Sequence, residues 1–123
     1  MQRPVFLNLF QMKFPAMAVA SILHRISGVI IFLGLPFALY LLDHSLRSSA
    51  EFAAMQSLMM QPAIKFLLWV LLSASAFHVL AGIRHMIMDC GFGEHLSTAR
   101  MTAFFIMLLE IAVMVLLGVW LWG

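Results

Sequence analysis

Residues 66–83 read FLLWVLLSASAFHVLAGI, a run of 18 residues that contains no formal charge. A helix needs about 20 mainly apolar residues to cross a bilayer core about 30 Å thick, so this run and its flanks predict a membrane-spanning helix. Pro62 suits the first turn of that helix, and Gly91 and Gly93 suit the region just beyond its end. We therefore predict a span over about residues 62–89.

Two further apolar runs flank this one. Residues 26–42 carry no formal charge, which predicts a first span over about 21–42, with a kink at Pro36 because proline removes one backbone hydrogen bond. Residues 101–123 carry a single acid and end in two tryptophans that suit the membrane interface, which predicts a third span over about 100–122.

The composition excludes a water-soluble monomer. Of the 123 residues, 64% are apolar and 10% are charged, and the mean hydropathy is +1.06, whereas soluble domains average about 45–50% apolar and about 25% charged residues. We expect an all-α membrane protein with one domain over residues 1–123.

The charge and motif content exclude several classes of ligand. The formal charge of +2 is too small to suggest nucleic acid. Cys90, the only cysteine, excludes an iron–sulfur cluster made by this chain alone, and the lack of a Gly-rich phosphate loop argues against a flavin site.

The connecting segments have their own patterns. Residues 3–10 are apolar but too short to cross a bilayer, so we expect a surface segment there. Ser48 and Glu51 have the spacing of a capping box, and Phe52, Met55 and Met59 follow at helical spacing, which predicts a short interfacial helix.

The distribution of Lys and Arg predicts the orientation in the membrane. Two of these residues flank the loop between the first and second spans, Arg47 and Lys65. Five precede the first span or flank the loop between the second and third spans: Arg3, Lys13, Arg25, Arg84 and Arg100. Cytoplasmic loops of membrane proteins carry an excess of Lys and Arg, so the N-terminus is expected in the cytoplasm and the C-terminus in the periplasm. The N-terminal stretch resembles neither a cleavable secretory signal nor an Arg/Ser-rich transit peptide, which favours a bacterial cytoplasmic (inner) membrane protein.

This topology brings most polar side chains to one leaflet: Ser21, His24, Arg25, His78, Arg84, His85 and Asp89. Ionisable residues are costly within a membrane span, so such a cluster suggests a functional site. His78 shares a helix face with Ala74, Ala81 and Gly82, and we expect a shallow recess there that suits a planar macrocycle whose iron is held by imidazole. A buried histidine bonded to a neighbouring helix is the alternative.

A second axial histidine is not expected from this chain. His85 follows His78 by seven residues, about 10 Å along a helix, so the two cannot ligate opposite sides of one iron. His44 and His95 are expected in solvated loops, and His24 is expected too near the membrane surface. A six-coordinate iron would therefore take its second histidine from another chain.

The cytoplasmic end of the first span suits an oxygen-bearing ligand. Ser21 and Arg25 share a helix face, with Ile22 beside them, and a hydroxyl and a guanidinium there could hydrogen-bond a quinone carbonyl. His24, Arg25 and His85 could reach haem propionates.

Structural alternatives stay open for these residues. Arg25 and Arg84 could be membrane anchors whose charged ends reach the headgroups, and Ser21 could bond only its own backbone. Glu110, inside the third span, needs a partner or a proton, and a structural role is favoured over a proton relay.

Two motifs resemble one family. The stretch Arg3-Pro4-Val5, then Phe14-Pro15, then Ser21-Ile22-Leu23-His24-Arg25-Ile26-Ser27-Gly28 is similar to the N-terminal signature of the cytochrome b anchor subunits of succinate dehydrogenase. The stretch His78-Val79-Leu80-Ala81-Gly82-Ile83-Arg84-His85-Met86-Ile87-Met88-Asp89 resembles the second signature of that family.

The resemblance implies an anchor subunit of respiratory complex II, which serves the tricarboxylic acid cycle and aerobic electron transport. It implies that His78 is an axial ligand of haem b, shared with a second small hydrophobic subunit. It further implies ubiquinone binding at Ser21, Ile22 and Arg25, and places His24 and His85 near the haem propionates or the quinone pocket. A flavoprotein would oxidise succinate and an iron–sulfur subunit would carry the electrons, because this chain cannot oxidise succinate alone.

Two alternatives to this interpretation remain at the level of the sequence. One is the anchor of a menaquinone-linked fumarate reductase, which could share the architecture. The other is a non-redox membrane protein for assembly or transport, in which His78 and Glu110 are only interhelical hydrogen-bond partners.

Overall fold

The computed structural model describes residues 15–123, which form four helices. They are α1 (Pro15–Ser45), α2 (Ser49–Met59), α3 (Pro62–Asp89) and α4 (Leu96–Trp122), and the described residues contain no strand. The prediction of an all-α membrane protein with three spans is confirmed, because α1, α3 and α4 are long and apolar enough to cross a membrane. The surface segment expected at residues 3–10 lies outside the described residues.

The helix bounds follow the sequence signals closely at α3 and less closely elsewhere. The predicted range 62–89 matches α3, with Pro62 in its first turn. Helix α1 begins earlier than predicted, because Pro15 has a backbone torsion suited to a helix start and alanines follow it. The helix also continues through Pro36, as membrane helices tolerate.

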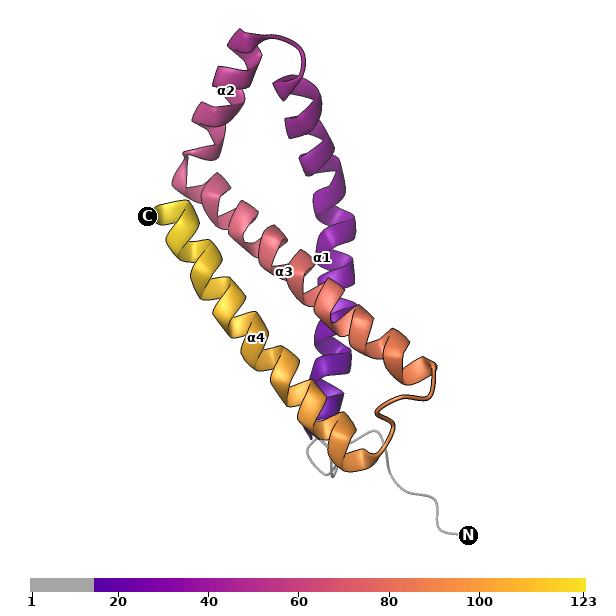
Figure 1. Ribbon diagram of the computed structural model, residues 1–123. Coiled ribbons are helices and arrows are strands. Elements are labelled where there is room, and N and C mark those ends of the chain that lie inside the picture. The colour runs from indigo at the N-terminus through magenta and orange to yellow at the C-terminus, as the bar shows by residue number, and fades with distance from the viewer. Residues whose placement is uncertain (1–14) are drawn as a thin grey trace.

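Helix α3 is the centre of the arrangement. It crosses α1 and runs beside α4, while α2 joins the far ends of α1 and α3 (Figure 1). Of the most apolar 18-residue window in each spanning helix, 22% is buried in α3 but only 6% in α1 or α4. The start of α1, the end of α3 and the start of α4 lie at the same end of the bundle (Figure 1).

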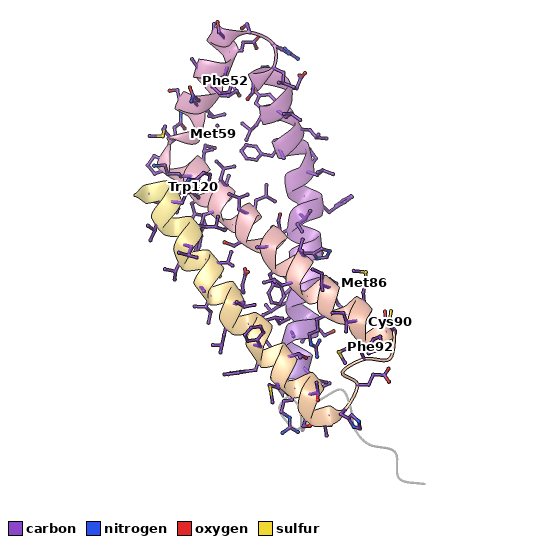
Figure 2. The ribbon with its side chains drawn as sticks, in the orientation of Figure 1. Phe52, Met59, Met86, Cys90, Phe92 and Trp120 are labelled. Carbon is purple, nitrogen blue, oxygen red and sulfur yellow. The ribbon has the colours of Figure 1, made fainter. Side chains whose placement is uncertain are left out.

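The buried core is small and contains mostly small side chains. Its members are Ala20, Phe77, Ala81, Ala103 and Ile106. Alanines let membrane helices approach closely, where packing rather than water exclusion drives association. Large apolar side chains such as Met86 and Trp120 project outward instead (Figure 2).

Two hydrogen-bonded side chains join α3 to α4. Near one end the Trp69 indole N–H donates to the Met114 carbonyl at 2.8 Å. Near the other end the Arg84 guanidinium donates to the Thr102 hydroxyl and to the Ala99 carbonyl, both at 3.0 Å. Arg84 thus links two helices and is half-buried, so it is more than a membrane anchor.

The connection through α2 confirms one expectation and corrects another. The Ser48 hydroxyl accepts from the Glu51 backbone N–H at 3.0 Å, as the capping pattern predicted. The expectation that His44 lies in a solvated loop is wrong: it lies in the last turn of α1, with Nδ1 3.0 Å from the Glu51 carboxylate and its ring beside Tyr40. His95 directly precedes α4 as its N-cap residue.

Two buried polar atoms share a cavity between α1, α3 and α4. Within residues 15–123, the Ser73 hydroxyl and one Glu110 carboxyl oxygen have no hydrogen-bond partner. Both residues line a mainly apolar cavity of about 260 Å³, together with Ser27 and apolar side chains such as Leu23 and Phe77. A buried polar atom without a partner costs about 1–3 kcal/mol, so this cavity is a source of instability.

Replacing Ala103 by Leu should destabilise the packing of α4. Ala103 is fully buried, and inserting a larger side chain into a packed core costs about 1–3 kcal/mol. Thermal unfolding of protein purified in mild detergent, followed by circular dichroism, should show a lower midpoint for Ala103→Leu. The control is Ala112→Leu, at an exposed position on the same helix. Equal midpoints for the two variants would contradict this packing.

Replacing Glu110 by Leu should stabilise the protein, by about 1–3 kcal/mol if the whole cost of the unpartnered oxygen is removed. The same thermal unfolding measurement checks it, and Glu94→Leu, in the exposed loop before α4, is the control. A lower midpoint for Glu110→Leu than for the control would mean that this carboxyl makes a favourable interaction.

Candidate functional site

Two histidines from different helices stack where α1 crosses α3. The rings of His24 and His78 have centroids 4.3 Å apart and planes inclined by 14°. Gly28 eases this approach, because a Cβ built there would lie 3.3 Å from His78 Cε1, closer than an ordinary contact. At Gly82 a Cβ would lie 3.7 Å from His24 Nε2, which is an ordinary contact distance, so the close approach depends mainly on Gly28.

The small residues around His78 serve this crossing. Ala74 and Ala81 are buried, and Ala81 packs in the core cluster with Ala20 of α1. The shallow recess expected beside His78 is therefore filled by α1 on this face. His78 itself remains half-buried, with exposed Val79 next to it.

Ser27 connects the two histidines. Its hydroxyl lies 2.7 Å from the His24 carbonyl oxygen and 3.0 Å from His78 Nδ1, and the residue is 4% exposed. The sequence shows Ser27 only as part of a motif. The contact joins residues 51 positions apart, so no local spacing signals it.

His85 extends the stack toward the end of the bundle. Its ring centroid lies 6.4 Å from that of His24, and its Nε2 lies 3.3 Å from the Asp89 carboxylate. The spacing of the sequence does not signal that His24 lies directly on the His78 ring, and α1 brings it there. The two rings lie face to face, so their nitrogens do not point at a common atom between them. A second axial histidine from another chain stays a prediction.

A polar cleft of about 280 Å³ opens beside this stack. Its lining residues are Ala20, Ser21, His24, Arg25, Ala81, Arg84 and His85. Two arginines, two histidines and a serine thus line one small space. Such a set offers several hydrogen-bond donors and positive charge to an oxygen-bearing or anionic group.

The cleft gathers most, but not all, of the predicted site. Ser21, His24, Arg25 and His85 line it, and Ser21 and Arg25 are exposed. Ile22 and His78 are half-buried and do not line the cleft.

Comparison with known proteins identifies the family. Residues 1–117 match the model of the succinate dehydrogenase/fumarate reductase transmembrane subunit. The chain is also similar to the succinate dehydrogenase cytochrome b556 subunit of Coxiella burnetii (strain RSA 493 / Nine Mile phase I), with 42% identity over 122 residues that cover 98% of each chain. This multi-pass membrane protein therefore belongs to the transmembrane subunit family of succinate dehydrogenase and fumarate reductase.

Proposed function

We propose that this chain is the haem b-binding anchor subunit of a bacterial succinate:ubiquinone oxidoreductase, and that it contributes to the quinone-reduction site. The observation that carries the proposal is the cleft lined by Ser21 and Arg25, which adjoins the stacked His24 and His78. A hydrogen-bonding site for a carbonyl and a candidate metal ligand therefore lie side by side in one crossing of two helices.

The chemistry of His78 fits a haem iron. Within residues 15–123, Nδ1 is engaged by Ser27 while Nε2 makes no hydrogen bond. Imidazole commonly ligates haem iron through one ring nitrogen while a hydrogen bond at the other fixes the ring. His78 would hold the iron through Nε2, and His24, Arg25 and His85 are basic groups suited to propionates. When bound, haem b supplies a one-electron carrier.

Quinone reduction needs groups that hold the carbonyl and stabilise negative charge. The Ser21 hydroxyl and the Arg25 guanidinium can both donate to one carbonyl oxygen, and the cation stabilises the charge that develops there. Ile22, half-buried next to Ser21, would contribute apolar surface near the ring. The exposed apolar helix faces around the cleft suit an isoprenoid tail.

The remaining parts of the enzyme would come from partners. A second small hydrophobic subunit would supply the other axial ligand, and a flavoprotein and an iron–sulfur subunit would dock at the end of the bundle that carries the cleft. We propose that this end faces the cytoplasm, with the C-terminus in the periplasm. Within residues 15–123, Arg25, Arg84 and Arg100 belong to this end, and Arg47 and Lys65 belong to the other.

Replacing His78 by Ala should remove the haem. In the intact complex purified from membranes, the haem b absorption band should fall to a small fraction of that of the unmodified complex. His95→Ala, just before α4 at an exposed position, should leave the band unchanged. A full-strength, unshifted band in assembled His78→Ala complex would exclude His78 as the ligand.

Replacing Arg25 by Leu should uncouple the two half-reactions. Loss of a donor to a charge-bearing oxygen costs about 10²–10³-fold in rate at comparable sites, so quinone reduction should fall by about this factor. Succinate oxidation with an artificial acceptor should persist. Arg47→Leu, an exposed arginine at the opposite end, is the control. Parallel loss of both activities would count against a role of Arg25 in the quinone site.

A further inference from the structure

We propose that Ser27 is a positioning residue for His78, which fixes the tautomer of the imidazole and tunes its strength as an iron ligand. This inference rests on the proposed function, in which His78 binds the haem iron. It adds a role for a buried side chain that is not itself part of the cleft lining and that, in the proposal, does not touch the iron.

The hydrogen-bond geometry decides which ring nitrogen carries the proton. A serine hydroxyl has one proton to donate. The His24 carbonyl oxygen can only accept, and it lies 2.7 Å from Ser27 Oγ, so the hydroxyl proton points there. His78 Nδ1, 3.0 Å from the same oxygen, must then donate its own N–H to Ser27. In the neutral ring this leaves the lone pair on Nε2, the atom proposed to bind iron.

The surroundings hold this arrangement in place. Ser27 is 4% exposed, so water does not compete for its hydroxyl. The bond to the carbonyl three residues earlier ties the hydroxyl to its own helix. The His24 ring covers one face of His78, and Gly28 lies against its edge near Cε1. The orientation of the imidazole is therefore fixed by α1 before any iron is bound.

A hydrogen-bond acceptor at Nδ1–H has an electronic effect on the ligand. Electron density at the ring rises when this N–H is hydrogen-bonded, which makes Nε2 a stronger donor. A stronger donor stabilises ferric iron more than ferrous iron. Removing the Ser27 hydroxyl should therefore weaken haem binding and raise the reduction potential of the haem that remains.

The test compares four variants in the intact purified complex. Ser27→Ala removes the hydroxyl, while Ser27→Thr and Ser27→Val have nearly the same shape and differ by a hydroxyl against a methyl. Ser75→Ala is the control, since that hydroxyl donates to the Leu71 carbonyl of its own helix. Haem content during competition with an apo-haemoprotein measures affinity, and optical redox titration of the haem band measures the potential.

We expect Ser27→Ala and Ser27→Val to bind haem about 10-fold or more weakly, as is usual when a partner of a metal ligand is lost, and to show a more positive potential. Ser27→Thr and Ser75→Ala should remain close to the unmodified complex. Equal behaviour of the Thr and Val variants would overturn the proposal, because it would trace the effect to side-chain size. Unchanged affinity and potential in Ser27→Ala would overturn it as well. The proposed function fails separately if His78→Ala retains the unmodified haem band.

Discussion

The close crossing of α1 over α3 is the constraint on which the site depends. Gly28 leaves room for the His78 ring, since a Cβ at this position would lie only 3.3 Å from Cε1, and Ala20 and Ala81 pack in the core cluster. The result is a helix pair near enough for the rings of His24 and His78 to stack and for Ser27 to reach Nδ1. A larger side chain at Gly28 would break both the ring stacking and the Ser27 hydrogen bond at once.

The same crossing explains why the polar residues of the cleft lie together at one end of the bundle. The start of α1 meets the second half of α3, so residues from two helices line one cleft near a single end of the bundle. Arg84 takes part twice, since it lines the cleft and donates to Thr102 and Ala99 of α4. Helix α4 therefore supports the cleft without lining it.

The spans could be predicted from the sequence because they depend on length, apolar content and local end signals. The range of α3 and the Ser48 cap follow from proline, glycine and capping patterns within a few residues. The contacts between helices could not be predicted in this way. The stacking of His24 on His78, the bond from Ser27 and the bond from Trp69 to Met114 all join residues far apart in the chain. They depend on the crossing, and local spacing carries no information about it.

The uneven burial of the spanning helices bears on how the protein is made and maintained. Few residues in the most apolar part of α1 and of α4 are fully buried by the rest of the chain, and membrane helices can insert into the bilayer separately and pack later. In our proposal, neighbouring subunits would bury much of the remaining surface. The abundance of the folded subunit would then follow the supply of its partners, and copies made in excess would be the first to open and be degraded.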